Sequence, residues 1–123
     1  MSYIADFKGF IKLSATADVD RLDYKLNYLV DEDYKLEEKS VITEANNEYR
    51  WIKVTLEGYV NYDEADWYRF FEEFEADTVC GEICFTGEDH QHWRFIYKDN
   101  PAEKYKFQWI EQQGRIVYGE EVQ

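Results

Sequence analysis

The first pattern along the chain is an alternation of apolar and polar residues over positions 3–14. From Ala5 to Leu13, every second residue is apolar or glycine, and residues such as Asp6 and Lys8 lie between them. A period of two places the two sets on opposite faces of an extended chain. The pattern therefore predicts a first β-strand at residues 3–14.

A helical pattern follows this strand. Either Thr16 or Asp18 can cap the N-terminus of a helix, because both side chains accept a hydrogen bond from a free backbone amide. The apolar residues behind them recur at spacings of three and four: Val19, Leu22, Leu26, Leu29 and Val30. This spacing predicts a short amphipathic helix that buries one face.

Residues 31–39 are acidic and have no clear period, so we expect a connecting loop there. β-Branched and aromatic residues are then frequent in residues 40–45 and 49–60. Asn46 and Asn47 separate these segments, and asparagine tolerates the positive φ of a hairpin turn. We therefore predict two antiparallel strands, the second with Trp51, Lys53, Thr55 and Glu57 on one face and Ile52, Val54 and Leu56 on the other.

The clearest helical pattern lies at residues 63–77. Acidic residues open this segment, which suits the positive end of a helix dipole. Its aromatic residues fall at i, i+3, i+4 and i+7, which places them on one helix face: Trp67, Phe70, Phe71 and Phe74. We predict an amphipathic helix whose aromatic face is buried.

The rest of the chain has the composition of β-strands. We expect strands at residues 78–86, 92–98, 105–112 and 114–118, joined by turns at residues 87–89, 99–101 and 113–114. The predicted order is β-α-β-β-α-β followed by further strands, which matches the ferredoxin-like, or split β-α-β, arrangement. We therefore predict one α+β domain over residues 1–123, with both helices on one face of an antiparallel sheet. The C-terminal strands would continue the sheet as a β-meander or form a second small layer.

Charge narrows the classes of partner. The 123-residue chain has 27 Asp or Glu and 14 Lys or Arg, so its net charge is −13. Direct binding to nucleic acid or to an anionic membrane surface is disfavoured, because both need clustered basic residues. Aromatic residues make up 19% of the chain, which argues against disorder. No apolar run reaches the roughly 18 residues of a membrane helix and no basic leader precedes an apolar block, so we expect a cytoplasmic protein.

The conventional soft-metal ligands of the chain are Cys80, Cys84, His90 and His92. On a regular strand, residues 80 and 84 would be about 13 Å apart, too far for one zinc ion or a disulfide bond. Residues 31–33 lack the ligand pattern and turn glycine of an EF-hand loop. We therefore expect no metal or cofactor site, and we interpret the cysteines as thiols packed at a sheet face.

The sequence also lacks common motifs of catalysis. None of the three serines, Ser2, Ser14 and Ser40, lies in a Gly-x-Ser-x-Gly elbow, and the six glycines do not form a phosphate-binding loop. Carboxylates are so numerous that pairs of them arise by chance, and they are weak evidence for acid-base catalysis. We therefore expect a non-enzymatic protein.

Most of the negative charge is concentrated in two segments. Residues 63–77 have a net charge of −6 and residues 31–38 a net charge of −4. If the helix buries its aromatic face, Asp66, Glu73 and Asp77 project outward at about the spacing of nucleic-acid phosphates. Such a row can imitate a phosphate backbone, although an acidic helix face can also serve solubility alone. The candidate partner-binding residues are Asp31, Glu32, Asp33, Asp63, Glu64, Asp66, Glu72, Glu73, Glu75 and Asp77.

The second half of the chain carries a broader pattern. It combines the acidic aromatic helix with Gly87-Glu88-Asp89, Trp93-Arg94-Phe95, Tyr97-Lys98-Asp99 and a closing segment at residues 114–118. Over about its last 60 residues, the chain resembles small acidic proteins of bacterial phages and mobile elements. This resemblance implies an inhibitor of host defence, such as an anti-CRISPR protein or a DNA mimic, and it assigns no catalytic or binding residue.

From these features we predict a non-enzymatic interaction protein that occupies the basic nucleic-acid-binding surface of a host protein, with exposed Tyr or Trp side chains at the rim. One alternative is a small-molecule-binding or enzymatic domain with a pocket between sheet and helices. Another is a phage structural or assembly protein that self-associates through an unpaired edge strand, for example as a homodimer. A continuous acidic surface favours the first function, and a deep closed pocket favours the second.

Overall fold

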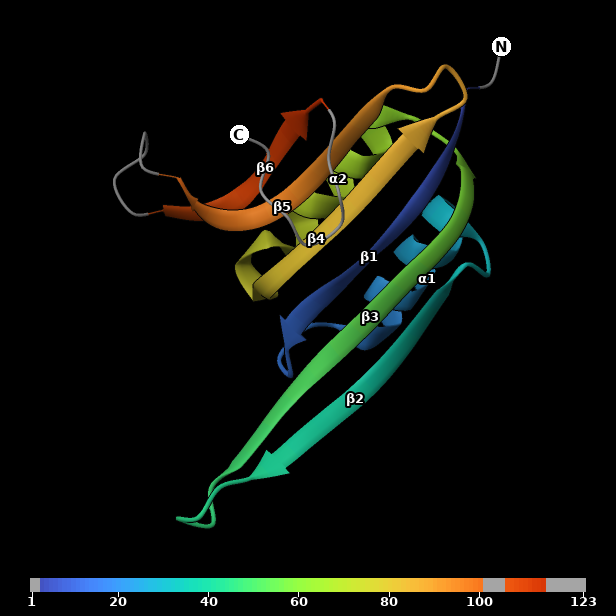
Figure 1. Cartoon of the computed structure of the whole chain (residues 1–123). Coiled ribbons are helices and arrows are strands. Elements are labelled where there is room, and N and C mark those ends of the chain that lie inside the picture. The colour runs from blue at the N-terminus through green and yellow to red at the C-terminus, as the bar shows by residue number, and fades with distance from the viewer. Residues whose placement is uncertain (1–2, 101–105, 115–123) are drawn as a thin grey trace.

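The computed structural model describes residues 3–100 and 106–114, which form one antiparallel sheet covered on one face by two helices (Figure 1). The six strands lie in the order β2-β3-β1-β4-β5-β6. In chain order, the elements are β1 (Ile4–Ser14), α1 (Val19–Val30), β2 (Tyr34–Ile42), β3 (Glu48–Asn61), α2 (Glu64–Phe74), the 3-10 turn η1 (Glu75–Asp77), β4 (Thr78–Gly87), β5 (His92–Asn100) and β6 (Lys106–Gln113). The predicted α+β class is confirmed.

Strand β1 lies in the middle of the sheet, because it pairs with β3 along one edge and with β4 along the other. Its alternating sequence gives it two different faces. The apolar set is buried toward the helices and continues across β3: Ala5, Phe7, Ile11, Leu13, Ile52, Val54 and Leu56. The polar set lies on the opposite side of the sheet, which we call the open face. The predicted first strand and the two faces of β3 are therefore confirmed.

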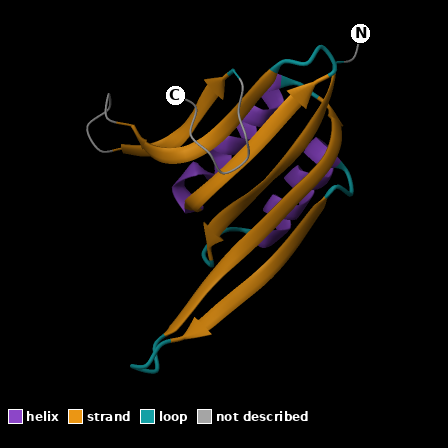
Figure 2. Cartoon of the chain, in the orientation of Figure 1, coloured by secondary structure: helices purple, strands orange, loops and turns teal. Residues whose placement is uncertain are grey.

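Both helices pack on the same face of the sheet (Figure 2). Helix α1 begins after Asp18, whose carboxylate accepts a hydrogen bond from the Arg21 amide at 3.1 Å. Helix α2 begins after Asp63, whose carboxylate accepts one from the Ala65 amide at 3.0 Å. Each helix buries its predicted apolar stripe, namely Leu22, Leu26, Leu29 and Val30 in α1 and Trp67, Phe70, Phe71 and Phe74 in α2.

Aromatic side chains fill the space between α2 and the sheet. The Trp67 ring meets Phe85 of β4 edge to face, with ring centroids 5.0 Å apart. Phe71 stacks on Trp109 of β6 at 4.3 Å, and Phe85 stacks on Trp93 of β5 at 5.4 Å. Burial of such large rings contributes substantially to stability, and their packing fixes the position of α2 on the sheet.

One segment differs from its predicted structure. The expected loop at residues 31–39 is wrong for most of its length, because β2 begins at Tyr34 and pairs with β3 as far as Ile42. The β2–β3 hairpin extends past the helices at one end (Figure 1), and most of β2 is partly or fully exposed. Tyr34 and Leu36 pack against the core, but the rest of this edge strand lacks the apolar alternation that identifies half-buried strands. The hairpin turn lies where predicted, and Asn46 adopts a φ of 60°.

The C-terminal strands continue the sheet as a meander, since β4 pairs with β5 and β5 with β6. The sheet therefore has six strands in the order β2-β3-β1-β4-β5-β6, two more than the predicted ferredoxin-like arrangement has. Strand β5 runs to Asn100 and includes two residues that the sequence placed in a turn. Pro101 and most of the predicted strand at residues 114–118 lie outside the described residues. Neither described helix is long and apolar enough to cross a membrane.

Candidate functional site

Helix α2 turns most of its acidic residues away from the sheet, because the sheet holds its aromatic face. Asp63 lies at the N-cap, and Glu64 and Asp66 follow in the first turn, where carboxylates interact favourably with the helix dipole. Glu64, Glu72 and Asp63 are exposed. The fold therefore presents a fixed set of carboxylates on the outer surface of α2.

The three carboxylates expected to imitate phosphates each have a partner within the protein. Asp66 accepts a hydrogen bond from Arg69, one turn along α2, at 2.6 Å. Glu73 accepts one from Nε of Arg21 in α1 at 2.9 Å. Asp77 accepts one from the Thr16 hydroxyl at 3.3 Å. Two of the three charges are therefore opposed by a guanidinium, and Glu73 and Asp77 also connect α2 and η1 to the segment that contains Thr16 and Arg21.

The other acidic residues of α2 and η1 are less engaged. In the part of the chain that the structure describes, Glu72 has no ion pair. Glu72 and Glu75 border a small hollow of about 180 Å³ that also contains Tyr68 and Trp109. Tyr68 donates a hydrogen bond to Glu111 of β6, and burial together with this bond raises the pKa of Tyr68. These two glutamates therefore add charge beside a half-buried aromatic surface.

The second acidic segment divides into a turn and a strand. Asp31 ends α1 with a φ of 55°, and its amide donates a hydrogen bond to the Asn27 carbonyl at 3.0 Å. Glu32 is exposed, whereas Asp33 is partly buried and accepts a hydrogen bond from the Tyr59 amide at 3.4 Å. Asp31 and Glu32 are therefore the outward charges of this turn.

Glu37 and Glu38 belong to β2 and lie on opposite faces of it, because consecutive residues of a strand alternate. Lys39 donates a hydrogen bond to Glu37 at 2.9 Å, and Lys35 lies 3.7 Å from the same carboxylate. The hydrogen bond from Lys39 holds the pKa of the Glu37 carboxyl below its usual value. The charge of this part of the segment is therefore balanced locally.

The two acidic segments approach each other at one end of the molecule. Asp31 lies beside the end of β3, where Asp31 and Asn61 both line a hollow of about 270 Å³. Helix α2 begins three residues after Asn61. We call residues 15–33 and 62–77 the helix layer. It contains 13 Asp or Glu and 3 Lys or Arg, a net charge of −10.

Exposed tyrosines accompany this charge. Tyr24 and Tyr28 lie one turn apart on α1, and 65% and 69% of their surfaces are exposed. The Arg21 guanidinium that pairs with Glu73 also lies 5.7 Å from the centre of the Tyr24 ring. The expected exposed tyrosines are therefore present, and Arg21 connects one of them to α2.

The cysteines and histidines do not gather into a metal centre. Among the described residues, no group of three or more His, Cys, Asp and Glu side chains could hold a metal ion. Cys80 and Cys84 are half-buried free thiols of β4 that share the open face with Glu82. His92 lies 3.2 Å from the Thr86 hydroxyl, and His90 occupies a turn with a φ of 65°.

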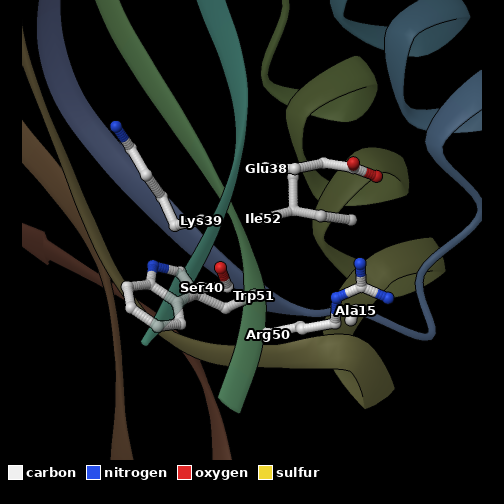
Figure 3. Close-up of a pocket in the computed structure, with 7 residues that line it drawn as sticks. All are labelled: Ala15, Glu38, Lys39, Ser40, Arg50, Trp51 and Ile52. Carbon is white, nitrogen blue, oxygen red and sulfur yellow. The ribbon is translucent and has the colours of Figure 1, made fainter. Parts of the chain in front are cut away.

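Sequence reasoning missed a set of lysines on the open face: Lys8 and Lys12 of β1, Lys35 and Lys39 of β2, and Lys53 of β3. Their alternation with apolar residues is visible in the sequence, but their common location depends on strand register. Figure 3 shows the residues around a hollow of about 310 Å³ beside this region. Lys39 and Trp51 point to one side of the hairpin there, and Glu38 and Arg50 point to the other.

Comparison of the chain with protein-family models, with curated proteins and with solved structures finds no significant match.

Proposed function

We propose that this protein is a non-enzymatic interaction protein whose helix layer docks onto a basic nucleic-acid-binding surface of a host protein. The observation that carries this proposal is the segregation of charge. The helix layer has a net charge of −10 out of −13 for the whole chain. A concentrated field of one sign accelerates association with an oppositely charged surface and excludes like-charged partners.

The rigidity of the layer supports the same function. The buried aromatic stripe fixes α2 on the sheet, and the pair between Arg21 and Glu73 joins α2 to α1. Because the two helices are held in place, binding would order only the exposed side chains and would not rearrange the backbone. Tyr24 and Tyr28 provide exposed aromatic surface next to these charges, and tyrosine is frequent at binding hot spots.

The geometry supports a choice among the acidic residues. Asp66 and Glu73 already have a guanidinium partner, so they contribute less to an external field than their number suggests. Glu32, Glu64 and Glu72 are exposed and contribute more. We therefore propose these three glutamates as the principal contacts with the basic partner.

A capture experiment from a bacterial lysate tests the proposal. The tagged protein is compared with a triple variant, Glu32→Lys, Glu64→Lys and Glu72→Lys. We expect the wild type to retain a nucleic-acid-binding protein at low salt, to lose it at high salt and to release it when duplex DNA is added. The triple variant should retain none of it.

A charge-matched control separates the helix layer from net charge. Asp6→Lys, Glu44→Lys and Glu88→Lys change the same amount of charge at exposed positions outside the layer. This control should bind as the wild type does, and thermal unfolding should establish that both variants fold. Equal loss of binding in the two variants, or the absence of any basic partner, would contradict the proposal.

We also propose that β1 to β4 and the two helices form a split β-α-β unit of the ferredoxin-like kind. Its support is the position of β3 between β1 and β2, with β4 along the other edge of β1. Strands β5 and β6 extend the sheet beyond β4. Helix α2 packs against this extension, since Phe71 of α2 stacks on Trp109 of β6.

A further inference from the structure

A second charged surface lies on the open face, opposite the helix layer. Five residues of three adjacent strands surround a hollow of about 520 Å³: Phe10 and Lys12 of β1, Lys39 of β2, and Trp51 and Lys53 of β3. We call it the lysine–tryptophan hollow. The hollow is open to solvent on one side, and its volume lies within the range of about 300 to 1,000 Å³ found for small-molecule sites.

Strand register brings these side chains together. Lys12 of β1 is directly opposite Lys53 of β3, and Trp51 of β3 is directly opposite Lys39 of β2. Side chains at directly opposed positions share one face of a sheet. The residues between them, such as Ile11 and Ile52, are buried on the helix side and hold the strands in this register.

The hollow has an excess of positive charge. Glu37 pairs with Lys39 at 2.9 Å, but within residues 3–100 and 106–114 neither Lys12 nor Lys53 makes an ion pair. Like charges directly across an antiparallel pair are destabilising. Glu37 is directly opposite Lys53 on the β2 side, so Lys12, Lys39 and Lys53 share one carboxylate here. A bound anion would offset the remaining positive charge.

The hollow also contains flat aromatic surface. Trp51 and Phe10 are both partly exposed, and the Lys12 ammonium lies 4.6 Å from the centre of a Trp51 ring. A planar ring can stack on such side chains. Any nucleic-acid base gains affinity from this contact, because every base has a flat aromatic face. The ligand that fits therefore combines an aromatic ring with several negative charges.

We propose that the lysine–tryptophan hollow binds a nucleoside phosphate, with its phosphates on Lys12, Lys39 and Lys53 and its base stacked on Trp51. The site takes a single nucleotide, because a longer nucleic acid would extend into the field of an acidic protein. The inference does not depend on the proposed function, since it uses the opposite face of the sheet.

Titration calorimetry with ATP, tripolyphosphate and adenosine tests this site. Tripolyphosphate has the charge of the nucleotide without its base, and adenosine has the base without the charge. We expect ATP to bind about 5- to 150-fold more tightly than tripolyphosphate, which corresponds to one base stacked on an aromatic side chain. Adenosine should bind more weakly than both. Chemical shifts of the wild-type protein should change first in β1, β2 and β3.

Variants assign the two parts of the ligand. The double variant Lys12→Gln with Lys53→Gln should lower the affinity for ATP at least tenfold. The charge-matched control, Lys25→Gln with Lys98→Gln, should leave this affinity unchanged. Trp51→Leu should reduce the affinity for ATP to that for tripolyphosphate and leave tripolyphosphate unchanged. The spectrum of the wild type locates the site even if a variant fails to fold.

Five results would overturn the proposal, and four of them come from the binding experiments. They are no binding of ATP, equal binding of ATP and tripolyphosphate, equal weakening by the two lysine double variants, and shift changes confined to other strands. A fifth is self-association that the Lys12 and Lys53 replacements abolish, because the acidic helix layer of a second copy would then be the occupant of the hollow.

Discussion

Glu82 of β4 accepts a hydrogen bond from Nη1 of Arg94 in β5 at 2.7 Å, and only 9% and 1% of their side chains are exposed. Both residues lie on the face of the sheet that the helices leave open. Nε of Arg94 also donates to Gln112 of β6 at 2.7 Å. One guanidinium therefore connects three consecutive strands of the meander.

Removal of Glu82 should destabilise the protein strongly. Glu82→Ala removes the carboxylate that lies 2.7 Å from the buried Arg94 guanidinium, and we expect the free energy of unfolding to fall by about 3 to 5 kcal/mol. Urea denaturation measures this change. The double variant Glu82→Leu with Arg94→Met should recover most of the loss, because it removes both charges. A single variant as stable as the wild type would show that the ion pair does not hold β4 to β5.

Gly9 should tolerate no larger residue. A Cβ at this position would lie 2.1 Å from the carbonyl oxygen of Glu82 and 2.6 Å from the Cα atom of Ile83. Both are backbone atoms, so strands β1 and β4 would have to separate. We expect Gly9→Ala to cost about 3 kcal/mol of unfolding free energy, the upper part of the usual range for overpacking. Thr55→Ala, at an exposed position of β3, should cost less than about 1 kcal/mol in the same urea titration.

The elements that the sequence predicts well are those in which local pattern and burial coincide. The stripe from Trp67 to Phe74 follows the helical period, and the same residues fill the core. Strand β2 could not be identified in this way, because its residues are partly or fully exposed. Its strand conformation comes from backbone pairing with β3, which no periodicity of its own side chains reveals.

The contacts of the candidate site also differ in how far they can be predicted from the sequence. The pair between Asp66 and Arg69 joins residues one helical turn apart, so the sequence alone suggests it. The contacts that occupy Glu73 and Asp77 come from Arg21 and Thr16, which are 52 and 61 positions away in the chain. The lysine–tryptophan hollow likewise depends on the register of three strands. Such contacts follow only from the tertiary fold.

The cap of α1 gives a local test of stability. Asp18 accepts a hydrogen bond from the Arg21 amide, which otherwise lacks a partner in the first turn. Asp18→Ala should lower the free energy of unfolding by about 1 kcal/mol. Asp18→Asn should be nearly as stable as the wild type, because asparagine caps helices about as well as aspartate. Asp20→Asn, in the first turn but without the cap, is the matched control. An equal loss in the alanine and asparagine variants would contradict a capping role.

Alkaline pH should weaken the fold partly through Cys84. Burial, and then the charge of Glu82, raises the pKa of this thiol to about 11, against about 8.5 in an unfolded chain. Below about pH 8.5 the thiol is protonated in both states, so its contribution is fully present. As the pH rises toward 11, the unfolded state loses the proton first and is favoured. Because Cys84 is only half-buried, we expect an effect on the order of 1 kcal/mol. In urea titrations at increasing pH, the free energy of unfolding of Cys84→Ser should decline less steeply than that of the wild type.

The same shift predicts slow chemistry at the thiol. Cys80→Ser leaves Cys84 as the single cysteine of the chain. Only the thiolate reacts with a disulfide reagent, so at pH 8 the folded variant should react far more slowly than free cysteine. Its rate should still increase with pH up to about 11, the pKa of the half-buried Cys84 thiol. The urea-unfolded variant should reach its maximal rate about two pH units earlier, near the ordinary range of a thiol. A folded protein whose rate levels off by pH 9 would show that the Glu82 side of β4 is open to water.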